Sequence, residues 1–499
     1  MRVPLLPRLC EKIFAIFSAG DASKRAMHYI AGTDRGQAHL LPPTVEDYVS
    51  AAAPVRVIDA FVEGLDLEKL GFLKPAKETG RPPYHPRTLL KLYTYGYLHR
   101  LRSSRRLEAE CARNLEVIWL TGQLQPDHWT IAAFRREHKE RFKAVLREFN
   151  LVCRKLELFG AELVAIDGAK FKAVNSPRRH YRAAELAELI AHIDARIDDY
   201  VQQLDQADEA TADVPGQPTA EQLAQKIAQL QHRRAEHAEL HQAMAAAGQT
   251  EVALTDPDSR GQKKVGVGYN VQIAVDAKHH LIAVETVEQA ANDVGQLHAM
   301  AQAAKAELGV TTSVADAGYH ERGQLQACEA AGLTTYVPAP TSTGQSTDGQ
   351  RVYPKEKFIY DATQDVYRCP AGQILPHAGN GQKHGKRCAY YYQMAACAAC
   401  SQKAACTRAT YRKLSRLENE AVVERQAQRV AAHPELVARR KTIVEHPFGT
   451  MRLWGHDEFL CRGLAMVRAE FSLTALAYNL RRALNLKGLT ALLAAFRPA

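Results

Sequence analysis

Residues 162–174 read ELVAIDGAKFKAV, and this stretch decides the fold class. It is a run of apolar and β-branched residues, which predicts a strand that ends in an Asp-Gly turn at Asp167. YNVQIAVDA (269–277) and LIAVETV (281–287) predict two more strands, and the connection between them has the length of a hairpin. The segment before them, residues 41–155, instead repeats its apolar positions at helical spacing. The chain therefore changes from helical to α/β structure at the end of that segment.

Four more elements follow the third strand. A helix is expected over 294–308, a strand in TTSVADAG (311–318), a helix over 321–331 and a strand in TTYVPAP (334–340). Three strands followed by helix, strand, helix and strand is the order of the RNase H-like fold, a mixed sheet with helices on both faces. We therefore expect an α/β chain with an RNase H-like mixed-sheet core over residues 156–490.

Two insertions are expected within this core. Residues 177–260 contain apolar positions at the spacing of an antiparallel helical hairpin or short coiled coil, interrupted by the breaker DVPGQP (213–218). This pattern fits a plain structural hairpin as well as an arm that dimerises or guides DNA. Residues 346–412 form a Cys-rich insertion that holds half of the ten cysteines.

The charge of the chain is unevenly distributed. The formal net charge of +10 and the pI near 9.0 favour a polyanionic partner such as nucleic acid. Most of the excess lies in residues 81–150, with 14 Lys and Arg against 7 Asp and Glu. Short helices with a basic junction are typical of a helix-turn-helix DNA reader, although a solvated basic face on a structural helix has the same pattern. The predicted DNA-binding residues of this all-helical domain, 41–155, are Arg100, Arg102, Arg105, Arg106, Arg135 and Arg136.

Some functional classes are excluded by what the sequence lacks. No apolar run reaches the roughly 18 residues of a membrane span, so a membrane protein is not expected. Arg8, Glu11 and Lys12 interrupt the apolar N-terminal stretch, so we interpret residues 1–40 as an N-terminal extension and expect a cytoplasmic protein. GVGYNV (266–271) lacks the third glycine of a dinucleotide loop, and no GxxxxGK[ST] motif is present, so no nucleotide cofactor is expected.

Two aspartates stand at the predicted ends of strands. Asp167 follows the first strand as AIDG, and Asp316 follows the fourth as VADAG. Either motif alone fits a simple turn. The first and fourth strands are neighbours in the RNase H-like order, however, so the two carboxylates should meet. Glu445, in VEHPFG, fits a third acidic residue on a C-terminal helix. Four competing acids are excluded from this set: Asp256, Asp258, Asp276 and Asp293.

Five ordered motifs carry a family resemblance. They are PDHWTIAAFR (126–135), VAIDGAKFKA (164–173), TDPDSR with GYNVQIAVD (255–276), VADAGYHE (314–321), and VEHPFGTMRLWG (444–455) with the stretch that follows it. On these motifs the chain resembles the bacterial insertion-sequence transposases of the DDE class, in the branch with a Cys-rich insert. The resemblance implies that Asp167, Asp316 and Glu445 form a catalytic triad.

The same resemblance implies contacts to DNA. The family signature Tyr-x2-Arg-x3-Glu-x6-Lys matches here with Lys441, Glu445 and Arg452, so the charges are kept and the residue types are exchanged. The tyrosine position is Ala438, and no tyrosine contact is expected there. Lys441 and Arg452 are expected to bind DNA phosphates. The implied partner is double-stranded DNA at element ends and targets, bound by a homodimer or a higher synaptic complex and located with the bacterial nucleoid.

The chemistry implied for the triad depends on divalent metal ions. Mg²⁺ is a hard cation that prefers oxygen ligands, and two ions about 3.5 to 4 Å apart can stabilise the attacking and leaving oxygens of an in-line displacement. Two Mg²⁺ or Mn²⁺ ions are therefore expected at Asp167, Asp316 and Glu445.

The Cys-rich insertion suggests a second kind of metal site. The CxxC pair of Cys397 and Cys400, with Cys369 and Cys406, can supply tetrahedral Cys₄ coordination for structural Zn²⁺. Cys388 is a fifth candidate, so the ligand set stays open. Disulfides are disfavoured in the cytoplasm. Four thiolates leave no open position for a substrate, so such a zinc ion would fold the insertion rather than react.

The leading interpretation is a DNA transposase that cleaves and transfers strands at insertion-sequence ends. Two alternatives remain open from the sequence: a catalytically inactive, transposase-derived DNA-binding protein, and an RNase H-like nuclease that cuts without strand transfer. A zinc-dependent hydrolase would need an open site with His or carboxylate ligands, and the thiol-rich pattern argues against it.

Overall fold

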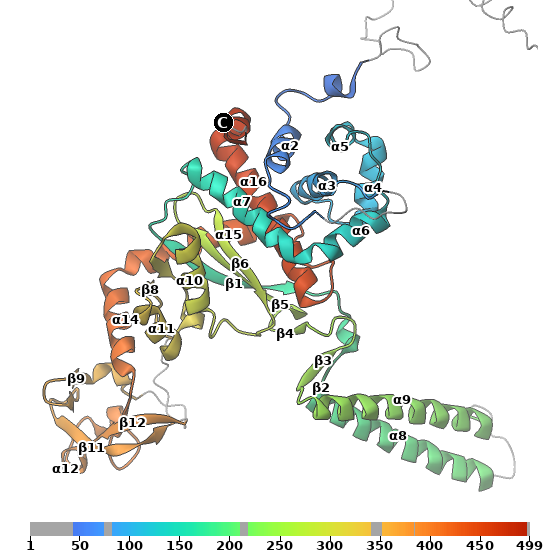
Figure 1. The fold of residues 1–499 in the computed structure, drawn as a ribbon. Coiled ribbons are helices and arrows are strands. Elements are labelled where there is room, and N and C mark those ends of the chain that lie inside the picture. The colour runs from blue at the N-terminus through green and yellow to red at the C-terminus, as the bar shows by residue number, and fades with distance from the viewer. Residues whose placement is uncertain (1–42, 74–81, 210–217, 341–351, 384, 497–499) are drawn as a thin grey trace, which may run out of the picture. The chain divides into compact units, whose positions relative to one another are not determined.

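A computed structural model describes residues 43–73, 82–209, 218–340, 352–383 and 385–496 (Figure 1). The chain divides into two compact units, residues 1–47 and 48–499. The expected N-terminal extension, 1–40, lies outside the described residues. Everything below concerns the second unit.

The N-terminal part of this unit consists of short helices. They are α2 (Val55–Glu63), α3 (Pro86–Leu98), α4 (Ser104–Arg113), α5 (Leu115–Leu120), α6 (His128–Glu137) and α7 (Phe142–Lys155). Local capping fixes several starts: the Asn114 side chain accepts from the backbone N–H groups at the start of α5, and Asp127 accepts from Thr130 N at the start of α6. The helical character predicted for this segment is confirmed.

The main sheet contains the five predicted core strands. They are β1 (Val164–Lys172), β5 (Gly266–Asp276), β6 (Ile282–Glu288), β7 (Thr312–Val314) and β8 (Thr334–Tyr336), and the short β4 (Arg260–Gln262) also pairs with β5. The strands follow the order β6-β5-β1-β7-β8, with β5 antiparallel to both of its neighbours, β6 and β1, and with β7 and β8 parallel to β1. The prediction of a mixed sheet is confirmed.

The first and fourth predicted strands are neighbours, as expected. Val164 of β1 lies opposite Ser313 of β7, and Ala165 lies opposite Val314. The predicted helices are α10 (Leu297–Leu308) and α11 (Arg322–Ala330), and α10 packs on β1, β5 and β6. One expectation is wrong: β1 does not end at an Asp-Gly turn, because it continues to Lys172 while paired with β5.

The last helices bind the N-terminal helices to the sheet. α15 (Pro434–Leu453) packs on β1, whereas α16 (Leu464–Phe496) packs on β6, α2, α3 and α7. Figure 1 shows α7 and α16 side by side. The rings of Phe61 and Phe149 contact Phe496 with centroids 5.4 and 6.2 Å apart. One hydrophobic core thus includes helices and sheet, and residue 155 marks a change of secondary structure within one compact unit.

Two long helices lie between β1 and β5 along the chain. α8 (Ala183–Glu209) and α9 (Ala220–Ala246) pack against each other through Leu186, Ile193, Leu223 and Ile227, which are buried. An ion pair joins Asp194 to Arg234. The strands β2 (His180–Arg182) and β3 (Glu251–Ala253) pair at the base of the two helices.

The cysteine-containing segment has a sheet of its own. β9 (Ile359–Asp361), β10 (Val366–Arg368), β11 (Ile374–Lys383), β12 (Lys386–Tyr391) and β13 (Leu414–Leu417) form it, with α12 (Met394–Ala398) and α13 (Lys403–Cys406) after β12. It has a small separate core: Phe358, Tyr367, Leu375, Tyr391 and Leu414. α14 (Glu420–Ala432), which contacts α11 and β8, then leads the chain back to α15. In the described part of the chain, no helix has the length and apolar character needed to span a membrane.

Candidate active site

Asp167 and Asp316 come from neighbouring parallel strands. Asp167 lies in the middle of β1, where its carboxylate accepts hydrogen bonds from Gly168 N (2.9 Å) and Arg440 Nη1 (2.8 Å). Asp316 follows β7 and caps the turn after it by accepting from Gly318 N at 2.8 Å. The structure therefore brings the two aspartates predicted from the sequence to one part of the sheet.

The two carboxylates influence each other electrostatically. Burial raises the pKa of Asp167 to about 6, and the negative charge of Asp316 adds to this rise, whereas Arg440 opposes it. A buried carboxylate beside a second carboxylate resists ionisation, and a bound cation would remove that resistance. The charge and donor chemistry of this pair fit a divalent metal ion.

A further aspartate lies beside this pair. Asp293, in the loop after β6, accepts from Lys170 Nζ (3.1 Å), Asn270 Nδ2 (2.9 Å) and Gln272 Nε2 (2.7 Å). Burial raises the pKa of Tyr319, and the charges of Asp293, Asp167 and Asp316 raise it further. The sequence pattern excluded Asp293 from the triad. The structure places it beside Gly168 and Asp316: a Cβ atom on Gly168 would come within 2.5 Å of Asp293 Oδ1, and one on Gly318 would lie 3.0 Å from Asp316 Oδ1 and 3.8 Å from Asp293 Oδ2.

Two other acids excluded from the triad have structural partners. Asp256 accepts from Tyr269 Oη (2.8 Å) and Gly463 N (2.9 Å), which ties the loop before β4 to the start of α16. Asp276 accepts from the backbone N–H groups of Gly160, Ala161 and Lys278. Both carboxylates stabilise turns.

Glu445 lies on α15, whose inner side presents Arg440 to Asp167. Its side chain is 63% exposed and pairs with Lys441 one turn earlier, with Nζ and Oε1 3.6 Å apart. Within the described residues, no three His, Cys, Asp or Glu side chains lie close enough together to hold a metal ion. The structure thus brings Asp167 and Asp316 together. From α15 it is Arg440, which the sequence did not single out, and not Glu445 that contacts Asp167.

The predicted DNA-binding arginines fall into two groups. Arg102 is only 9% exposed and donates to the carbonyl oxygens of Gly455 and Glu458 and to Glu470 Oε1. Arg135, also 9% exposed, donates to Tyr97 Oη. Both guanidinium groups are buried and have partners inside the protein, so in this structure they are not accessible to DNA. The remaining predicted residues are exposed: Arg100, Arg105, Arg106, Arg136, Lys441 and Arg452.

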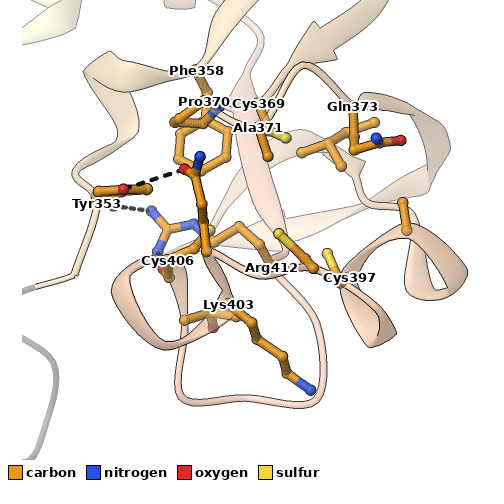
Figure 2. Close-up of a pocket in the computed structure, with 15 residues that line it drawn as sticks. Tyr353, Phe358, Cys369, Pro370, Ala371, Gln373, Cys397, Lys403, Cys406 and Arg412 are labelled. Carbon is orange, nitrogen blue, oxygen red and sulfur yellow. Dashed lines mark hydrogen bonds between the residues drawn. The ribbon is translucent and has the colours of Figure 1, made fainter.

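Four of the five cysteines in the cysteine-containing segment line one cavity. They are Cys369, Cys397, Cys400 and Cys406, and Figure 2 shows the cavity with three of them labelled. Burial raises the pKa of Cys406, the other three cysteines raise it further, and Arg412 lowers it. Cys388 is instead buried on β12 and does not line the cavity. These four thiols fit a soft cation in chemistry, although their sulfurs are not drawn together into a closed ligand set.

Two family models match the chain. One, described as Transposase domain (DUF772), matches residues 43–137, which include the exposed arginines of α4 and α6. The other, described as Transposase DDE domain, matches residues 368–484, which include the four cavity cysteines and Glu445. No curated protein matches the chain. The helical segment and the C-terminal segment are thus matched separately to transposases, on either side of the strands that carry Asp167 and Asp316. Both matches support an insertion-sequence transposase of the DDE class.

Proposed function

We propose that the protein cleaves DNA at the ends of an insertion sequence and transfers the cut strands, using Asp167, Asp316 and Glu445. The pairing of Asp167 with Asp316 on adjacent parallel strands carries this proposal. The sheet order, with three antiparallel strands followed by two parallel ones, supports an RNase H-like core. Both matched family models support the assignment to transposition.

Asp167 and Asp316 would hold Mg²⁺ or Mn²⁺, and Glu445 would complete the ligand set from α15. Bound metal ions supply charge stabilisation and activate an oxygen nucleophile for phosphodiester displacement. The chain's own groups prepare this site. Gly168 N orients one Asp167 oxygen, while Arg440 occupies the other at 2.8 Å and offsets its charge. Because Arg440 opposes the rise in the pKa of Asp167, it favours the ionised form that a metal ion needs.

DNA would contact the exposed basic groups around this site. Lys441 and Arg452 lie on the same helix as Glu445, and Arg105, Arg106 and Arg136 lie on α4 and α6. A guanidinium or ammonium group that neutralises a phosphate releases counterions, so duplex binding should weaken steeply with salt. Synapsis of two element ends would place two copies of the chain in one complex.

We also infer a structural zinc ion bound by Cys369, Cys397, Cys400 and Cys406. The supporting observation is that the four thiols line one cavity; burial raises the pKa of Cys406, and repulsion by the other three cysteines adds to the rise. A bound zinc ion would relieve that repulsion and would link α12 and α13 to the small sheet. The hydrophobic core of this sheet contains only five buried side chains among the described residues, so the zinc ion would add to its stability.

The test is cleavage and joining of a labelled duplex that carries the element's ends, with Mg²⁺ or Mn²⁺. Asp167→Asn, Asp316→Asn and Glu445→Gln should each abolish cleavage and leave duplex binding intact. Glu435→Gln is the matched control, because Glu435 is an exposed glutamate in the first turn of the same helix. Binding without any cleavage by the wild type would indicate a DNA-binding protein instead. Cleavage without joined products would indicate a nuclease.

A further inference from the structure

A polar pocket, separate from the cavity lined by cysteines, lies between the end of α3 and the helices α15 and α16. Three arginines line it, Arg100, Arg481 and Arg482, together with His446 and Thr450. None of the described residues that line this pocket carries a carboxylate. Pockets in which several cations face each other without an acid attract anions.

The arginines of this pocket have carbonyl or ring partners rather than acidic ones. Arg482 Nε donates to His279 O at 2.8 Å, and its Nη1 lies 3.4 Å from His446 Nε2. Arg481 Nη2 donates to Leu98 O over 3.4 Å. Within the described residues neither forms an ion pair, so both charges remain available.

Arg100 is exposed, as Arg481 is, but its backbone differs from that of the other two arginines. It has φ = 65°, in the left-handed region that residues with a Cβ rarely adopt. A conformation of this kind costs about 1 kcal/mol or more and is found disproportionately at binding sites. Here it ends α3 and directs the chain so that Arg100 lines the same pocket as the α16 arginines.

His446 lines the pocket beside Arg482. Its Nδ1 pairs with Tyr478 Oη at 2.7 Å, and Tyr478 Oη donates to His280 O at 2.7 Å. The ring is therefore held in place, with Nε2 toward Arg482.

The position of the pocket relates it to Glu445. His446 follows Glu445 directly on α15, and Thr450 lies one turn further along the helix. The pocket thus flanks the exposed side of α15 that carries Glu445, where a DNA strand that reaches this carboxylate would pass.

We propose that this pocket binds a backbone phosphate of duplex DNA beside Glu445. The identity of the polymer rests on the proposed function, whereas the preference for an anion rests on the arginines alone. Guanidinium groups bind phosphate oxygens through paired N–H donors, so three of them in one pocket suit a phosphodiester.

The test measures the affinity of a fluorescent random-sequence duplex of about 30 base pairs over a series of KCl concentrations. Asn485→Asp adds a carboxylate to the pocket at an exposed lining position without removing any arginine, and Arg100→Gln removes an exposed charge. Each should raise Kd about five- to tenfold and reduce the salt slope by about 0.9, one phosphate contact. Arg233→Gln, an exposed arginine of α9, is the control and should leave both unchanged.

Wild-type affinity and salt slope in both pocket variants, with unchanged thermal unfolding, would overturn the proposal. A second result would also overturn it: inorganic phosphate stabilises the wild type more than KCl of equal ionic strength does, while both variants bind DNA normally. The pocket would then bind a free anion rather than DNA. The proposed function fails separately: a wild type that never cuts DNA, while the pocket variants lose affinity, would remove the catalytic assignment and leave the phosphate site standing.

Discussion

Replacing Asp167 by Asn should stabilise the metal-free protein at neutral pH. The pKa of Asp167 rises from its ordinary value of 3.8 to about 6 on folding, mainly through burial. The native state therefore holds this proton more tightly than the unfolded chain does. The resulting loss of stability begins as the pH rises above 3.8 and is complete above about 6.

The size of the effect follows from the same shift. A difference of about two in pKa corresponds to about 3 kcal/mol of destabilisation by the ionised group. Asparagine removes the charge but has only one side-chain oxygen, so it cannot accept from both Gly168 N and Arg440 Nη1 as Asp167 does. Losing one of these hydrogen bonds costs about 1 kcal/mol, which leaves a net gain of about 2 kcal/mol at pH 7.

Urea unfolding between pH 4 and pH 8, with a chelator present, measures this gain. The stability curves of wild type and Asp167→Asn should approach each other near pH 4 and separate above pH 6, and added Mg²⁺ should stabilise only the wild type. Asp198→Asn, on the exposed side of α8, should change little. A variant no more stable than wild type at pH 7, or a difference that persists at pH 4, would refute the argument.

Three other outcomes are expected. Arg102→Ala should lower the free energy of unfolding by about 3 to 5 kcal/mol, because it leaves the buried Glu470 carboxylate without its ion-pair partner, and an unchanged urea midpoint would contradict this. Lys441→Gln should weaken duplex binding about fivefold without changing the melting temperature, because its side chain is 70% exposed, and unaltered affinity would exclude it as a phosphate contact. Cys397→Ser should reduce the zinc content measured by atomic absorption and increase hydrogen exchange in residues 352–417, whereas full zinc occupancy would exclude this thiol as a ligand.

The strands and their order could be predicted because buried strands leave continuous apolar runs in the sequence. Asp167 could be found as well, but its place within β1 could not. Asp-Gly is usually a turn signal, whereas here β5 pairs with β1 on both sides of it. The glycine has another cause: a Cβ atom on Gly168 would come within 2.3 Å of Gln272 Nε2. The sequence shows that a glycine is present, and only the tertiary structure shows which atoms require it.

The roles of the arginines could not be separated from the sequence. Arg102 and Arg106 belong to the same basic run, yet one is buried and the other exposed. The carboxylate that Arg102 meets lies 368 residues later, so no local pattern reports it. The position of Asp293 could not be predicted for a similar reason, since its loop lacks a motif and only the folded sheet brings it beside Gly168.

The packing of α16 against α2, α3 and α7 also has a consequence for biosynthesis. The early helices can complete their apolar core only after residues 464–496 have left the ribosome, roughly 300 residues later. At ordinary translation rates of about 5 to 20 residues per second, that delay is about 15 to 60 seconds. A nascent or prematurely terminated chain would expose the apolar faces of these helices throughout, so chaperones and proteases would act on it before it reached DNA. Only chains that extend through α16 would fold, which limits DNA engagement to complete copies of this unit.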